Sequence, residues 1–246
     1  MTRHANALVV LLSLLSAGCA SQPNAKTDPR DPFERVNRAT YKFNDALDHA
    51  VLRPVAKGYK KVTPQFVQTG VSNFFTNLGQ PTVIVNDLLQ AKFVPALSDT
   101  GRFLLNTTAG IGGLLDPASA AGLDKHDEDL GQSFGKWGVP AGPYLMVPFF
   151  GPTTVRDGIG RLGDVYTDPL YYVEEDKVRY SIYALSLVNL RAGLLDTDQT
   201  LEQAFDKYAF LRNAYLQRRE YQVTDGAVSP VDDEPLEDPE AEDSKK

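Results

Sequence analysis

Residues 101–123, GRFLLNTTAGIGGLLDPASAAGL, decide the fold that we expect for this chain. None of the side chains from Phe103 to Leu115 is charged. Asp116 can cap a helix, and Pro117 behind it suits the first helical position. The glycines in residues 110–113 allow a tight turn and a close approach of two backbones. We therefore predict two short apolar helices joined by a glycine-rich turn.

This hairpin supplies the first set of candidate functional residues. They are Phe103, Leu104, Leu105, Gly110, Ile111, Gly112, Gly113, Leu114 and Leu115. Each helix is too short to cross a bilayer, which needs about 20 apolar residues. Two interpretations remain open: a hairpin buried in the core, and a hairpin that lies at a membrane and handles apolar ligands. Under the second, we expect Gly112→Val or Gly113→Val to block a passage without unfolding the protein.

Composition narrows the possible partners. The chain has 246 residues, 42% of them hydrophobic, and a formal net charge of −7. Residues 231–246 alone carry −6, which leaves −1 for the rest. A nearly neutral domain argues against nucleic acid as a partner, because such binding needs a basic surface. The single cysteine excludes an internal disulfide and a metal site built from several cysteines.

The N-terminus is typical of a bacterial lipoprotein precursor. Residues 1–18 combine a basic start, a short apolar run and small residues, which predicts a signal peptide. Cys19 follows at once and resembles the acylated cysteine of a lipobox, although Ser16 stands where Leu is usual. Residues 19–30 then form a polar tether. No Asp follows Cys19, so we expect the outer membrane of a Gram-negative bacterium. The alternative is an ordinary secreted protein that is cleaved nearby.

Proline and glycine divide the rest of the chain into short segments, and none shows sustained strand alternation. We predict a mainly α domain over residues 31–222 and an acidic, disordered tail over residues 223–246. The first helix should start with Asp31 as its cap and end or kink at Arg53-Pro54. The other expected helices cover residues 55–62, 64–79, 82–90, 132–137, 153–165, 174–195 and 198–219, with one more opening at Pro95, and residues 144–150 read as strand-like.

Several residues hint at chemistry that their context does not support. Ser133 lies in a G-x-S-x-G pattern, but acidic residues precede it and no histidine follows it, as a hydrolase of that type requires. We expect a loop serine there. The acidic residues 124–129 could bind a cation or form a solvated loop, since they lack the spacing of an EF-hand. His49 lies near the end of a predicted helix, where a structural role is the simpler interpretation.

Motifs spread over residues 31–219 resemble those of the MlaA (VacJ) family of outer-membrane lipoproteins. Segments that carry the resemblance include DPFE at 31–34, RPVA at 53–56, GIGG at 110–113 and EDLGQSFG at 128–135. The family-motif residues singled out as candidates are Asn37, Arg38, Phe43, Asn44, Arg102, Asn106, Gly142, Pro143 and Tyr144.

The resemblance implies a flat ring of helices at the inner leaflet of the outer membrane, around a central amphipathic channel. It implies removal of phospholipid from the outer leaflet, a soluble periplasmic lipid carrier and a trimeric outer-membrane porin as partners, and neither catalysis, nor a metal, nor a cofactor. The rival hypothesis is a scaffolding lipoprotein that binds a porin without moving lipid. A passage near residues 110–113 would favour transport, and a filled centre would favour the scaffold.

Overall fold

The computed structural model describes residues 28–227. Cys19, the signal peptide, most of the tether and residues 228–246 lie outside the described residues. The elements are α2 (Glu34–Leu47), the π-helical turn η1 (Asp48–Leu52), α3 (Arg53–Val62), α4 (Gln65–Leu89), α5 (Phe93–Thr108), α6 (Pro117–Ala120), α7 (Leu130–Lys136), β1 (Tyr144–Val147), β2 (Gly151–Thr154), α8 (Val155–Asp164), η2 (Pro169–Tyr172), α9 (Asp176–Gly193), η3 (Leu195–Thr197), α10 (Asp198–Gln203) and α11 (Lys207–Val223). The predicted mainly helical class is confirmed.

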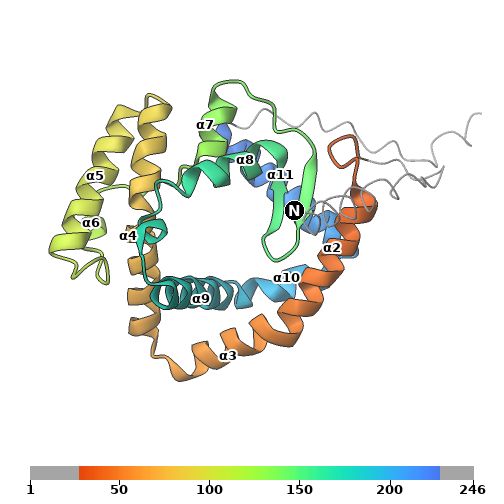
Figure 1. Ribbon diagram of the computed structural model, residues 1–246, viewed down its shortest axis with the longest axis horizontal. Coiled ribbons are helices and arrows are strands. Elements are labelled where there is room, and N and C mark those ends of the chain that lie inside the picture. The colour runs from red at the N-terminus through yellow and green to blue at the C-terminus, as the bar shows by residue number, and fades with distance from the viewer. Residues whose placement is uncertain (1–27, 228–246) are drawn as a thin grey trace, which may run out of the picture.

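The longer helices follow one another around a common centre (Figure 1). In that view α2 lies on the right, α3 along the bottom and α4 on the left. Helices α7, α8 and α11 lie at the top, and α9 runs beside α3. The α5–α6 hairpin packs against α4 on the side away from the centre. This arrangement separates two regions of possible function, the centre and the outer hairpin.

The first helical stretch passes its proline without ending. The π-helical turn η1 joins α2 directly to α3, and Pro54 is the second residue of α3. A proline donates no backbone hydrogen bond and its ring crowds the preceding turn, so a wider turn just before it relieves the conflict. The kink expected at Arg53-Pro54 therefore takes the form of one π turn.

The predicted break at Gly79 was wrong. A single helix of 25 residues, α4, runs through Gly79 and Pro81. Gly79 has no positive φ, so it does not adopt the left-handed conformation that ends many helices. Contacts with α5, α7 and α9 hold α4 along its length. Tertiary packing thus overrides the local tendency of proline to stop a helix.

Asp31 is not the cap that the sequence suggested. The first residue of α2 is Glu34, and Phe33 at the cap position makes no side-chain capping bond. Asp31 is instead fully buried, and its carboxylate accepts hydrogen bonds from Asn37 and Arg212 at 2.8 and 3.1 Å and from the Tyr208 hydroxyl. Its charge is matched by an arginine from α11, which lies far away in the sequence.

Three further boundaries differ from expectation. The strand-like segment is a two-stranded antiparallel hairpin, with Tyr144 opposite Thr154, so residues 153 and 154 belong to β2 and α8 begins later. The last predicted helix is split into α10 and α11, because Asp206 caps α11 by accepting a hydrogen bond from the Ala209 amide. Finally, α7 begins at Leu130 rather than Gln132.

The interior is unusually polar. Among the described residues, nine hydrophobic side chains are buried, against nineteen polar or charged ones. The buried hydrophobic cluster of Tyr144, Met146 and Tyr208 is small, and partly buried side chains such as Tyr41 and Tyr215 pack against it. Many large hydrophobic side chains are exposed instead. Water-soluble domains bury such side chains, so this distribution suits a protein whose outer surface meets an apolar medium.

Within residues 28–227, none of the helices combines the length and the apolar character that crossing a membrane requires.

Candidate lipid-binding site

The α5–α6 hairpin has a polar seam inside and apolar side chains outside. Arg102 is buried, and its guanidinium donates to both oxygens of Asp116 at 3.1 and 3.0 Å and to the Leu123 carbonyl at 2.6 Å. Asn106 donates to Asp116 at 2.9 Å and accepts a hydrogen bond from the Ala118 amide at 3.0 Å. Asp116 caps α6, as the sequence predicted. The two family-motif residues of this region therefore hold the hairpin together.

The glycine-rich turn needs its glycines at particular positions. A Cβ at Gly110 would lie 2.4 Å from the Asn106 carbonyl oxygen, and one at Gly113 would lie 2.5 Å from Cβ of Asn77. Gly112 and Gly113 have φ values of +69° and +91°, which L-residues rarely adopt. The turn thus packs directly against α4.

The apolar candidates of the hairpin mostly face outward. Ile111 is 67% exposed, and Leu104, Leu114 and Leu115 are also exposed, while Phe103 and Leu105 are half-buried. Large apolar side chains at the N-terminal ends of α4 and α5 are exposed as well, namely Phe66, Phe93, Val94 and Leu97. Of the two interpretations of the hairpin, the buried core does not hold for these side chains.

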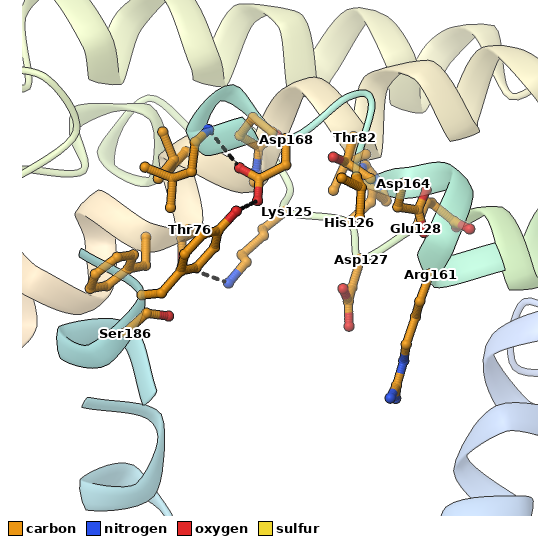
Figure 2. Close-up of a pocket in the computed structure, with 18 residues that line it drawn as sticks. Thr76, Thr82, Lys125, His126, Asp127, Glu128, Arg161, Asp164, Asp168 and Ser186 are labelled. Carbon is orange, nitrogen blue, oxygen red and sulfur yellow. Dashed lines mark hydrogen bonds between the residues drawn. The ribbon is translucent and has the colours of Figure 1, made fainter. Parts of the chain in front are cut away.

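A cavity of about 490 Å³ opens near the centre of the molecule, between α4, the loop of residues 125–128, α8 and α9 (Figure 2). The apolar part of its wall consists of Phe75, Leu78, Val83, Val165 and Leu170. The polar part consists of Thr76, Gln80, Thr82, Lys125, His126, Asp127, Glu128, Arg161, Asp164, Asp168, Tyr183 and Ser186. None of the nine hairpin candidates lines this cavity, so the structure separates them from the opening that it contains.

Most carboxylates of the cavity wall already accept hydrogen bonds from neighbouring groups. Asp164 accepts hydrogen bonds from the Leu130 amide and from Asn86, and Asp168 accepts from the Leu170 amide and the Tyr183 hydroxyl at 2.9 and 3.0 Å. Burial raises the pKa of Asp164, against the hydrogen bonds that lower it. These contacts fix α8 against α7 and α4, and they shape the wall of the cavity rather than offering free acceptors.

Basic side chains from other parts of the chain form ion pairs with the acidic residues of the loop. Glu128 pairs with Lys92 at 2.7 Å and accepts from Gln90 at 2.7 Å, while Asp129 pairs with Arg219 at 2.7 Å. Arg219 also contacts Asp157 at 2.9 Å, so one guanidinium joins α7, α8 and α11. Within residues 28–227, no group of three or more His, Cys, Asp or Glu side chains is placed to hold a metal ion.

One buried carboxylate near the cavity lacks such partners. Asp87 on α4 is fully buried, and neither of its oxygens has a hydrogen-bond partner among the described residues. Burial, followed by the negative charges of Asp99 and Glu128, raises its pKa to about 7, against the opposing charges of His126 and Lys92. Asp99 is buried as well and contacts His126 Nδ1 at 2.6 Å.

The family-motif residues of α2 hold the β-hairpin. Asn37 donates to the Tyr144 carbonyl at 3.1 Å and accepts from the Met146 amide at 2.9 Å. Asn44 donates to the Val147 carbonyl at 3.0 Å and accepts from the Phe149 amide at 2.9 Å.

The other family-motif residues of this region make separate contacts. Arg38 pairs with Asp206 at 2.7 Å, and the Phe43 ring packs edge-on against the Phe149 ring. Gly142 has a φ of +69°, and the Pro143 carbonyl accepts a hydrogen bond from the Val155 amide.

Ser133 lies in α7, and the expectation of a loop serine was wrong. Its hydroxyl is fully buried, donates to the Asn86 side chain at 2.8 Å and accepts from Gln90 at 3.2 Å. His126, the nearest histidine in the sequence, contacts Asp99 instead. His49 bonds the Asp45 carbonyl at 2.9 Å on the surface of the helix. The serine is therefore a structural link between α4 and α7.

Sequence reasoning missed the cavity residues on α8 and α9. Arg161, Asp168, Tyr183 and Ser186 stand in ordinary amphipathic helices and turns, and only the fold brings them to one opening. Lys125 lies within the acidic loop, where carboxylates dominate the local sequence. A lone cation among acids was the one available signal.

Comparison with known proteins agrees with this architecture. The family model described as MlaA lipoprotein matches residues 29–222. The intermembrane phospholipid transport system lipoprotein MlaA of Escherichia coli K12 is 35% identical over 226 residues, which cover 90% of both chains. The protein with the same description from Haemophilus influenzae is 33% identical over 229 residues, 89% of this chain and 92% of its own.

A solved structure that concerns the maintenance of bacterial outer membrane lipid asymmetry is also similar. Its chain superposes with a TM-score of 0.71 at 34% sequence identity, and the match covers 78% of this chain and 98% of that one. Sequence and fold agree over the same helical domain. This chain therefore belongs to the MlaA lipoprotein family.

Proposed function

We propose that this protein removes phospholipid from the outer leaflet of the outer membrane and passes it to a soluble periplasmic carrier. The observation that carries the proposal is the cavity of about 490 Å³, whose wall is apolar on one part and polar on another. A phospholipid has the same division between acyl chains and headgroup. The relatives from Escherichia coli and Haemophilus influenzae, named as phospholipid transport lipoproteins, support it.

The location that suits this function is the inner leaflet, with an anchor at Cys19. A buried acyl chain contributes about 0.8 kcal/mol per CH₂, so two or three chains would hold the protein firmly. Exposed side chains such as Phe66, Phe93, Leu97 and Ile111 would then enter the apolar part of the leaflet. Short helices can lie there without crossing, because their backbone polar groups are already paired.

The α5–α6 hairpin acts in this proposal as a membrane-embedded element rather than as the wall of the channel. Its apolar side chains are exposed on the outer side of α4, whereas the cavity lies toward the centre. Burial of Arg102 against Asp116 keeps the charge of the arginine away from the leaflet. Lipid would pass through the centre and the hairpin would position the ring.

A scaffolding protein that only binds a porin remains the rival, and a trimeric porin remains a proposed partner here. An open centre favours transport, because a pure scaffold gains nothing from an unfilled cavity, whose walls forgo packing contacts. We also propose that transport involves no catalysis, since Ser133 is engaged with Asn86 and Gln90 rather than with a histidine.

The test is a strain of the source bacterium that lacks the protein. Phospholipid accessible to an added phospholipase should rise at the cell surface, and the wild-type gene should reverse the rise. A strain with unchanged surface phospholipid but impaired porin assembly would favour the scaffold. Cys19→Ser should leave an unprocessed precursor and fail to complement, and a mature N-terminus elsewhere in the wild-type protein, found by mass spectrometry, would contradict the anchor.

A further inference from the structure

Arg161 differs from the other arginines of the described part of the chain. Each of the others has at least one contact with a neighbouring group, most often a carboxylate, as in Arg102–Asp116 and Arg219–Asp157. Within residues 28–227, Arg161 alone has neither a hydrogen bond nor an ion pair. Figure 2 shows its side chain extending from α8 into the open space of the cavity. The side chain is exposed to this space, and none of its five N–H donors has a partner among the described residues.

The backbone that carries Arg161 is rigidly held. A Cβ at Gly160 would lie 2.4 Å from the Gly131 amide nitrogen, which shows how closely α8 packs against α7. Asp157, one turn earlier, binds Arg219 of α11 at 2.9 Å. The face of α8 that bears these residues is buried, so Arg161 is directed away from it and toward the cavity.

A second cation of the same wall is nearly free. The ammonium group of Lys125 has one hydrogen bond, to the Thr76 hydroxyl, at a long 3.4 Å. The carboxylates Glu128, Asp164 and Asp168 of the same wall are already bonded to Lys92, Asn86 and Tyr183. Asp127 is shared with Arg218 at 3.4 Å. The cavity thus has spare positive donors and few spare acceptors.

We infer that Arg161 and Lys125 form a phosphate-binding subsite of the cavity, which takes the phosphodiester of a glycerophospholipid headgroup. This inference rests on the proposed function and names the part of the site that selects a phosphate-bearing lipid over a neutral one. Arg161 offers the planar pair of donors that matches two phosphate oxygens, and Lys125 adds a point charge. The apolar wall at Phe75 and Leu78 lies in the same cavity and suits the start of the acyl chains.

The experiment measures, by isothermal titration calorimetry, the affinity of the full mature lipoprotein in detergent for dihexanoyl phosphatidylglycerol. Arg161→Gln should weaken the affinity roughly ten-fold, because a hydrogen bond to a charged group is lost. Lys125→Gln should weaken it less, and Arg161→Lys should retain most of it. The matched control Lys57→Gln removes one positive charge from exposed α3 and should leave the affinity unchanged. Added salt should weaken the wild type more than Arg161→Gln.

Two further ligands separate the possible sources of the phosphate chemistry. Dihexanoylglycerol has the same chains without phosphate, and it should bind the wild type and Arg161→Gln equally. Inorganic phosphate should bind much more weakly than the phospholipid; equal binding would assign the subsite to a free anion and overturn the lipid assignment. Unchanged phospholipid affinity in Arg161→Gln would overturn the subsite while leaving the transport proposal intact. Failure of the deletion strain to accumulate surface phospholipid would instead count against the proposed function.

Discussion

Arg102 and Asp116 face each other across the α5–α6 turn, with Nη2 of the arginine 3.1 and 3.0 Å from the two carboxylate oxygens. Only 1% of the arginine side chain is exposed, while the leucines around it point outward. A hairpin of a water-soluble protein would expose the arginine and bury the leucines. The pair therefore lets an element with an apolar exterior keep its polar caps and turns satisfied inside.

Removing this arginine should destabilise the protein strongly. Arg102→Met removes the arginine donor from Asp116 and from the Leu123 carbonyl, and losing a hydrogen bond that involves a charged group costs about 1.5–3 kcal/mol of unfolding free energy. Denaturant titration in detergent measures the change. Lys42→Met removes an exposed charge from α2 and should change stability by less than about 0.5 kcal/mol. Equal losses in the two variants would contradict the buried role of Arg102.

Two neighbouring glycines of the turn should respond differently to a methyl group. Gly113→Ala forces a Cβ to 2.5 Å from Asn77, so we expect a loss of several kcal/mol, which corrects the expectation that a larger side chain there leaves the fold intact. A Cβ at Gly112 would have no atom within 4 Å, so Gly112→Ala should lose only the cost of a positive φ of +69° in an L-residue, about 1 kcal/mol of unfolding free energy. Thermal unfolding of both variants tests this, and a similar melting temperature for the two would be inconsistent with the packing of the turn on α4.

Asp87 should make the protein less stable as the pH rises. Burial and the charges of Asp99 and Glu128 raise its pKa from 3.8 to about 7, so the folded state holds the proton more tightly than the unfolded state. The contribution of Asp87 to the free energy of unfolding is fully present below about pH 4 and is lost as the pH increases through 7.

Asp87→Asn removes this dependence. We expect the variant to exceed the wild type at pH 8 by on the order of 2 kcal/mol and to show no advantage at pH 4. Unfolding titrations at a series of pH values provide the measurement, and Asp196→Asn, at an 81% exposed side chain, serves as the control. A wild-type stability that rises between pH 5 and 8, with no difference in Asp87→Asn, would argue that Asp87 has a partner.

Ser133→Ala should affect stability but not transport. The hydroxyl links Asn86 and Gln90 in the interior, and its loss costs about 1–3 kcal/mol because those groups lose a partner. Surface phospholipid should stay low in complemented cells once protein levels are matched. Accumulation of phospholipid with a normally abundant Ser133→Ala protein would mean that the serine takes part in chemistry.

The sequence predicted what local chemistry determines. Asp116-Pro117 starts a helix because a cap and a fixed φ act over four residues, and α6 begins there. Asp31 also precedes a proline, yet its carboxylate binds Arg212 and Tyr208 from α11 instead of capping a helix. Capping preferences depend on neighbouring residues only, so they cannot predict this long-range contact. Pro81 likewise stays within α4 because distant helices pack around it. The cavity could not be predicted for the same reason, since Lys125, Arg161 and Ser186 meet only through the closure of the fold.

The central cavity can be tested by filling it. Ser186 lines the cavity from α9, whereas Ser181 on the same helix is exposed and does not. Ser186→Trp should occupy space that lipid needs and should raise surface phospholipid toward the level of the deletion strain. Ser181→Trp adds the same ring to the same helix outside the cavity and should complement fully. Both variants carry the same helix-propensity penalty, well under about 1 kcal/mol, so abundance and melting temperature should stay close to each other. Full complementation by a stable Ser186→Trp protein would show that lipid does not pass through this cavity.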